Sequence, residues 1–325
     1  MRPSPVIGLF ILMLGLPISS MAQIATPSDS MSIATSGDFA GLVDIGGRQM
    51  YLTCRGVGSP TVILEAGAGN DADTWDTVGL TPDSTQTAVL PGVASFTQVC
   101  AYDRPGTLLD LDHRSRSDPV PMPRTAADVV ADLHALLSAA AIPGPYVMAA
   151  HSFGGLVVRL YTATYPDEVV GLVLIDAAHE DYYTAMRETL TPEQRAQQTR
   201  LEEQGPPELA DYPNRERLDP DASAAEVRAA TSASPLRPLP LIVLTHGRSW
   251  DWPPSYPAAA LEAVWLLLQE NLAALTPNSR LVVAGQSGHF IPGDQPDLVI
   301  DAIRQVVDAV RDPSMWATPQ ATLPI

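Results

Sequence analysis

Ser152 is the residue of this sequence best placed for nucleophilic chemistry. It lies in the hexapeptide AHSFGG at residues 150–155, after an apolar run and before a helical pattern. Ala150 and Gly154 keep the positions around it small, as a sharp strand-to-helix turn requires, and such a turn exposes a serine hydroxyl for attack on a carbonyl carbon. The alternative interpretation is a serine that only caps the following helix.

A serine hydroxyl needs a neighbouring base to accept its proton. His289 stands in the tripeptide GHF at residues 288–290, between the last apolar run and the last helical pattern, and is the predicted general base. The other histidines suit this role less well. His134 lies in a helix, His113 in a polar loop and His151 beside the serine. His179 and His246 lie at strand ends, where they would line a pocket.

Two carboxylates are candidates for orienting the imidazole of His289. Asp176 directly follows an apolar run, whereas Asp251 lies in a loop after a later run. Both positions belong to the carboxyl edge of a parallel sheet, where open α/β sheets hold their sites. Asp176 is preferred because the loop to Asp251 also holds two tryptophans and two prolines, but Asp176 could instead cap the first turn of the next segment.

Attack on a carbonyl also requires donors for the developing oxyanion, usually two backbone N–H groups. One is expected from Phe153, which follows the serine. The other is expected from the turn EAGAGN at residues 65–70, where small residues let the backbone approach a substrate, and Ala68 is the predicted donor.

Short apolar runs alternate with helical patterns along the chain, which predicts a mostly parallel sheet covered by helices on both faces. The predicted strands are 49–54, 61–65, 98–102, 146–150, 170–175, 239–245 and 280–284. The predicted helices are 125–141, 153–165, 258–275 and 296–310.

Residues 178–237 break this alternation and are predicted to form a helical lid between two parts of a core, 41–177 and 238–312. Tyr182, Tyr183 and Trp250 are expected to line an apolar pocket, since aromatic side chains offer large contact areas, and the alternative is that they only dock the lid. The Ser- and Thr-rich segment 23–40 is interpreted as a disordered leader, and 313–325 as a flexible tail.

The first 22 residues carry Arg2, a short apolar run and small residues before Gln23, which is typical of a cleaved signal peptide. We therefore expect a secreted or periplasmic protein without a stable membrane anchor. The formal net charge of −18 disfavours nucleic acid and anionic membranes as partners and favours a neutral small-molecule substrate. The oligomeric state is left open.

The two cysteines, Cys54 and Cys100, could form a disulfide in an oxidising compartment or remain two buried thiols. Neither the cysteines nor the scattered histidines show the spacing of a metal site, so no metal or other cofactor is expected.

These pieces, in this order, resemble the α/β-hydrolase superfamily and within it the lidded, esterase-like branch, over roughly residues 42–311. The resemblance is carried by EAGAG at 65–69, YDRPG at 102–106, HSFGG at 151–155, LID at 174–176 and GHF at 288–290. It implies an eight-stranded, mostly parallel sheet and, because the family's second strand neighbours its fourth in antiparallel fashion, a cross-strand disulfide between Cys54 and Cys100. Serine at position 152, in place of aspartate, disfavours dehalogenases and epoxide hydrolases of the same fold.

The resulting hypothesis is hydrolysis of a neutral, apolar carboxylic ester through an acyl-enzyme. The same residues would also suit an amidase or aminopeptidase. A ligand-binding protein of hydrolase fold without turnover is the alternative from another class.

Overall fold

The computed structural model describes residues 37–79, 85–204, 209 and 211–317. The predicted signal peptide at 1–22, most of the predicted leader, and residues 318–325 of the predicted tail lie outside the described residues. Within the described part of the chain, every helix is too short or too polar to cross a lipid bilayer.

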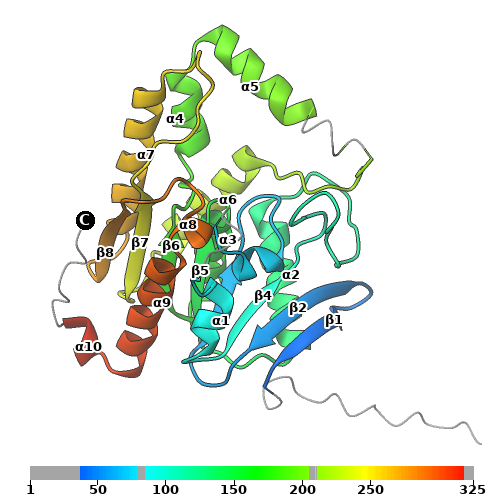
Figure 1. Cartoon of the computed structure of the whole chain (residues 1–325), viewed down its shortest axis with the longest axis vertical. Helices are drawn as coiled ribbons and strands as arrows, with labels where there is room; N and C mark the ends of the chain where they lie inside the picture. The colour runs from blue at the N-terminus through cyan, green and yellow to red at the C-terminus, as the bar shows by residue number, and fades with distance from the viewer. Residues whose placement is uncertain (1–36, 80–84, 205–208, 210, 318–325) are drawn as a thin grey trace, which may run out of the picture. The chain divides into compact units, whose positions relative to one another are not determined.

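Eight strands form one sheet in the order β1-β2-β4-β3-β5-β6-β7-β8 (Figure 1). β2 pairs antiparallel with β1 and β4, and the other neighbouring strands are parallel, as the alternating sequence pattern predicts. The strands are β1 (Phe39–Asp44), β2 (Gln49–Arg55), β3 (Thr61–Glu65), β4 (Val99–Tyr102), β5 (Tyr146–His151), β6 (Val169–Ile175), β7 (Leu241–His246) and β8 (Ser279–Ala284).

Helices cover both faces of the sheet. α2 (Ala126–Ala139) and α3 (Gly154–Thr164) pack on one face, and α1 (Val89–Ala94) and α9 (Pro296–Arg311) pack on the other. Each core is built from apolar stripes at helical spacing and from the alternate side chains of the strands. The remaining elements around the core are η2 (Ala72–Asp76), α7 (Ala258–Ala273), α8 (Ile291–Asp294) and α10 (Ser314–Ala317).

The predicted lid segment contains three helices and no strand among its described residues. These are α4 (Tyr182–Thr189), α5 (Pro192–Gln204) and α6 (Pro220–Ala233). α4 packs on α7 through a small apolar cluster that includes Tyr182, Met186 and Trp265. We refer to residues 178–237 as the insertion, and its role as a lid stays a prediction.

Two ordered elements lie where the sequence pattern indicated leader and tail. β1 begins at Phe39, inside the predicted leader, and pairs with β2 from Phe39 opposite Cys54. Its residues alternate between exposed and half-buried, so this edge strand lacks the continuous apolar run that marks the buried strands. α10 lies inside the predicted tail, where Arg280 stacks 4.1 Å from the ring centre of Trp316 and donates to its carbonyl.

Cys54 and Cys100 form a disulfide between the antiparallel strands β2 and β4, as the family resemblance implies. The two residues are direct partners in the strand register, and both are buried. The bond joins positions separated by 46 residues in the chain, so it closes a long loop in the unfolded state.

Replacing both cysteines by alanine should lower the free energy of unfolding by about 2–4 kcal/mol, because a long cross-linked loop restricts the unfolded chain. Urea unfolding of the double variant and of the oxidised wild type measures this difference directly. Equal midpoints with equal denaturant dependence would contradict the prediction.

Candidate active site

The turn between β5 and α3 holds Ser152 in a strained conformation. Its φ angle is 54°, a left-handed value that is uncommon for a residue with a side chain. The turn is also tight, since a Cβ added at Gly154 would lie 2.8 Å from the carbonyl oxygen of Glu65. The backbone carbonyl of Ser152 accepts hydrogen bonds from Gly155 and Ala178, which anchors the turn on both sides.

A continuous hydrogen-bonded chain runs from Ser152 through His289 to Asp176. The Ser152 Oγ lies 2.9 Å from His289 Nε2, and His289 Nδ1 lies 2.6 Å from Asp176 Oδ2. Asp176 is fully buried, whereas 29% of the His289 side chain is exposed. These distances suit proton transfer from the hydroxyl to an imidazole that a carboxylate orients.

Of the two candidate acids, it is Asp176 that contacts His289. It follows β6 directly at φ 44°, and its backbone N–H donates to the carbonyl of Leu244 over 2.7 Å. Asp251 is exposed in the loop after β7. The carboxyl ends of β5 and β6 are adjacent in the sheet, which is why Asp176 lies beside the turn that holds Ser152.

Asp176 accepts more hydrogen bonds than a carboxylate that only orients one histidine. Trp265 Nε1 donates to its Oδ1 over 2.8 Å, and His246 Nδ1 donates to its Oδ2 over 2.8 Å. Burial on its own raises the pKa of Asp176, but the hydrogen bonds and charges of His246 and His289 outweigh it and bring that pKa well below its ordinary value. These partners therefore favour the ionised form of Asp176.

His246 lies between two carboxylates. Its Nε2 donates to Glu262 over 2.8 Å, opposite the bond from Nδ1 to Asp176, and only 5% of the side chain is exposed. Burial lowers the pKa of His246, but its bonds to Asp176 and Glu262 raise it above the ordinary value overall. Acceptors on both sides of the ring therefore stabilise the cationic form of His246.

His246 was expected in the pocket lining, and Glu262 was not among the predicted site residues. His246 ends β7, one strand beyond β6, so its position at the carboxyl edge was the available signal. Glu262 lies in α7 and also accepts from Trp252 Nε1 over 2.6 Å and from the backbone of Trp250 over 3.0 Å. Its role depends on how α7 packs and carries no local sequence signature.

Replacing His246 by asparagine should shift the acid limb of the activity profile to higher pH. Removing this cation leaves the charge of Asp176 less compensated, and a nearby negative charge favours the protonated form of His289, which cannot act as a base. A shift of one pH unit corresponds to about tenfold less activity below the limb. The measurement is kcat/KM against pH for a p-nitrophenyl ester.

The matched control for this measurement is His113→Asn, since His113 is exposed and pairs with Asp110 in a surface loop. An acid limb at the same pH in wild type and His246→Asn would show that the imidazolium has no influence on His289.

His151 holds the loop that carries His289. Its Nε2 donates to the backbone carbonyl of His289 over 2.8 Å. Burial, helped by the nearby His289, lowers the pKa of His151 to about 3, so it is neutral and keeps this single proton at Nε2. The residue next to Ser152 therefore positions the loop of His289.

Arg104 shapes the turn that contains Ala68. Its guanidinium is buried and donates to the carbonyls of Ala66 and Gly67 over 2.9 and 2.6 Å. It also pairs with Glu65 of β3 and with Glu216 of the insertion, each over 2.6 Å. One planar group with five donors satisfies all of these acceptors.

Ala68 and Phe153, the predicted oxyanion donors, line one pocket of about 530 Å³. The pocket also includes Tyr183, one of the three aromatic residues expected there. Tyr182 is instead buried against Trp265, and Trp250 packs 4.4 Å from the ring centre of His289. Tyr182 thus packs between helices and Trp250 packs against the imidazole of His289, which fits the alternative that these rings dock the insertion.

The family model of the alpha/beta hydrolase family matches residues 62–302, which is most of the chain and includes the turn, the serine, the acid and the histidine. The chain belongs to the α/β-hydrolase family. Among curated relatives of this α/β hydrolase, the protein YqjL of Bacillus subtilis is 25% identical, and the match covers 78% of this chain and 85% of that one.

A second relative, described as a probable transporter, efuK, of Hormonema carpetanum, is 28% identical over 47% of this chain, which spans 20% of that protein's length. Among solved structures, a thermophilic esterase from Thermogutta terrifontis has a TM-score of 0.53 and 20% identity, covering 85% of this chain and 99% of that chain. At this identity the likeness concerns the α/β-hydrolase fold.

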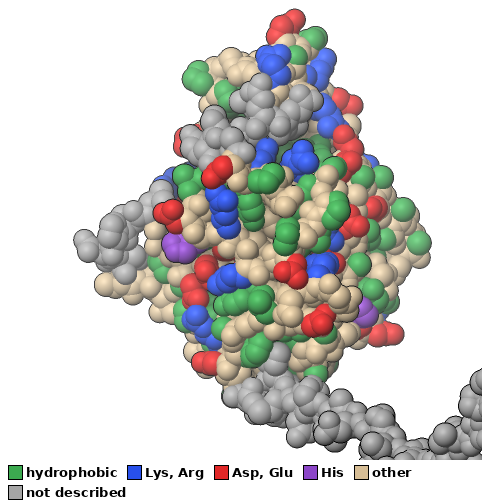
Figure 2. Space-filling view, turned by 90° about the vertical axis from the view of Figure 1, so that its right-hand side faces the viewer, with side chains coloured by type: hydrophobic (Ala, Val, Ile, Leu, Met, Phe, Trp, Pro, Cys, Tyr) green, Lys and Arg blue, Asp and Glu red, His purple; other side chains and the backbone are tan. Residues whose placement is uncertain are grey.

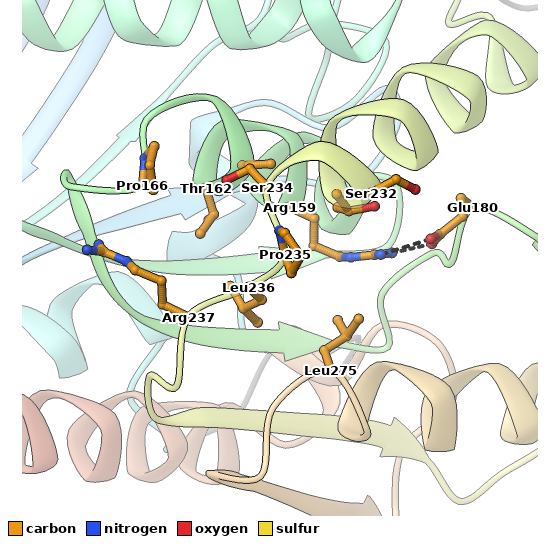
Figure 3. A pocket seen from close by; sticks show the side chains of 12 residues that line it. Arg159, Thr162, Pro166, Glu180, Ser232, Ser234, Pro235, Leu236, Arg237 and Leu275 are labelled. Atoms are coloured by element: carbon orange, nitrogen blue, oxygen red, sulfur yellow. Dashed lines mark hydrogen bonds and ion pairs between the residues drawn. The ribbon is translucent and has the colours of Figure 1, made fainter.

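This α/β hydrolase has another cavity, of about 230 Å³, between α3, α6 and the segment before β7 (Figure 3). Its charged groups are already satisfied, because Arg159 pairs with Glu180 and Arg237 pairs with Asp167. It contains none of the predicted site residues. Among the described residues, no group of three or more His, Cys, Asp or Glu side chains is arranged to hold a metal ion.

Proposed function

We propose that this α/β hydrolase cleaves a carboxylic ester through an acyl-enzyme, with Ser152 as nucleophile, His289 as general base and Asp176 as the orienting acid. The single observation that carries the proposal is the hydrogen-bonded chain from the Ser152 hydroxyl to the buried carboxylate of Asp176. A capping serine would have no need of an imidazole at 2.9 Å.

In the first half-reaction His289 Nε2 takes the proton of Ser152 as the oxygen attacks the ester carbonyl. The carbonyl oxygen becomes negative, and the N–H groups of Ala68 and Phe153 stabilise it from the pocket. The protonated imidazole is stabilised by Asp176 and then gives its proton to the departing alcohol. In the second half-reaction water replaces the alcohol and the steps run in the same order to release the acid.

Export fits the same proposal. The signal-peptide pattern at residues 1–22 and the disulfide between Cys54 and Cys100 both suit an oxidising compartment outside the cytoplasm. We place the protein in the periplasm or outside the cell.

The purified protein should react covalently with a fluorophosphonate probe at Ser152 and hydrolyse short p-nitrophenyl esters. Mass spectrometry of the labelled peptide identifies the modified residue, and absorbance at the nitrophenolate band gives the rate. Labelling should disappear at acid pH, since a protonated His289 has no lone pair for the serine proton. Absence of both labelling and turnover on esters and amides would leave a ligand-binding protein as the better description.

A further inference from the structure

Two arginines line the pocket beside the predicted oxyanion donors. Arg215 and Arg217 belong to the insertion and share the pocket lining with Ala68 and Phe153. Arg217 is exposed and Arg215 is partly buried. In the described part of the chain, neither guanidinium has a hydrogen bond, an ion pair or a ring contact, although both stand next to the well-paired Glu216.

The backbone that carries these arginines is attached firmly to the core. The N–H of Glu216 donates to the carbonyl of Gly106 over 2.7 Å, and the carbonyl of Arg217 accepts from Arg124 over 2.9 Å. The Glu216 carboxylate is bound to Arg104 and to the N–H of Gly69. Glu216 therefore anchors the backbone between the two arginines and fixes the positions of their Cα atoms.

Acidic residues outnumber basic residues in this chain. All 19 of its basic residues are arginine, against 37 acidic residues. Most arginines of the described chain contact a carboxylate, such as Arg55, Arg116 and Arg159. Figure 2 shows one face of the molecule on which arginine and acidic side chains are interspersed.

The acidic residues closest in sequence to the two arginines are already engaged. Glu216 is bound to Arg104, and the carboxylate of Asp219 accepts from the backbone of Ala222 at the start of α6. The uncompensated charge of the pocket lining is therefore positive, opposite in sign to the molecule as a whole. Guanidinium groups bind carboxylates through parallel N–H···O bonds.

We propose that the ester cleaved at Ser152 carries a second, anionic group, a carboxylate, and that Arg215 and Arg217 bind it in this pocket. The inference rests on the proposed ester hydrolysis and replaces the neutral substrate that the net charge favoured. The net charge describes the long-range field, whereas the selection of a bound substrate depends on the groups within contact distance.

The test compares substrates that differ only in this charge. One pair places it on the acyl side, the p-nitrophenyl monoester of glutaric acid against p-nitrophenyl pentanoate. The other pair places it on the alcohol side, the acetate ester of 4-hydroxybutanoate against butyl acetate. In at least one pair wild-type kcat/KM should favour the anionic ester about tenfold or more, the effect of a hydrogen bond to a charged group.

The variant Arg215→Gln/Arg217→Gln should bring that ratio of kcat/KM close to one. Arg200→Gln is the matched control, because Arg200 is an exposed arginine of α5 in the same insertion that does not line the pocket. It should leave the ratio at its wild-type value. If the double variant does not fold, the wild type alone still tests the proposal. Raising NaCl from about 0.05 to 0.5 M should lower kcat/KM for the anionic ester and leave kcat/KM for the neutral ester unchanged.

The outcomes separate the two proposals. Turnover of the neutral esters with no anionic preference in either pair, or a preference that persists in Arg215→Gln/Arg217→Gln, overturns the role of the arginines and leaves the ester hydrolase intact. Lack of fluorophosphonate labelling and of turnover on all four esters overturns the proposed function itself.

Discussion

Replacing Ser152 by alanine should reduce kcat for p-nitrophenyl ester hydrolysis by about 10⁴- to 10⁶-fold, because the variant lacks the hydroxyl bound to His289 and keeps only the proposed oxyanion donors and substrate binding. The fold should persist. Alanine keeps the Cβ that Ser152 already carries at φ 54°, so the turn gains no new strain. Steady-state kinetics and a thermal melt of the same preparation measure both effects.

Ser232→Ala is the matched control for this substitution. Ser232 is an exposed serine of α6 that lines the smaller cavity, and its loss should leave kcat unchanged. If Ser152→Ala kept its activity within about tenfold of wild type, a nucleophile other than Ser152 would have to exist, and the proposed mechanism would be wrong.

Replacing Asp176 by asparagine should lower kcat by about 10³- to 10⁴-fold, whereas Asp251→Asn should behave as wild type. An asparagine offers one acceptor oxygen where Asp176 accepts from His289, His246 and Trp265. It also lacks the negative charge that stabilises the imidazolium of His289 during the reaction.

The two substitutions remove the same charge and differ only in position, so their comparison identifies the acid. Because Asp176 is fully buried, a thermal melt must show that the asparagine variant is folded at the assay temperature. A large loss of activity in Asp251→Asn with a mild effect in Asp176→Asn would assign the acid to the loop after β7 and contradict the geometry described above.

The parts of the site that depend on local chain order were predictable from sequence. A serine between a buried strand and a helix and a histidine before the last helix each leave a pattern within a few residues. The choice between Asp176 and Asp251 rested on the bulk of one loop, since both follow strands that end at the same sheet edge. Deciding between the two carboxylates requires the sheet order and the contact of Asp176 to His289.

Other features could not be read from the sequence because they depend on packing between distant segments. Glu262 reaches His246 only through the placement of α7, and Glu216 reaches Arg104 across 112 positions of the chain. β1 was missed because an edge strand needs no continuous apolar run. The net charge likewise concealed the unpaired arginines, since a sum over the whole chain does not report local differences.

The position of Glu216 sets a condition for exchanging insertions between members of this family. The turn bearing Ala68 is held by Arg104, and a carboxylate contributed by the insertion completes the shell of that guanidinium and binds the N–H of Gly69. A chimera that grafts a foreign insertion onto this scaffold must supply an equivalent carboxylate. Otherwise the buried donors of Arg104 and the N–H of Gly69 that bind Glu216 would lose their acceptor, which would loosen the turn that contains Ala68.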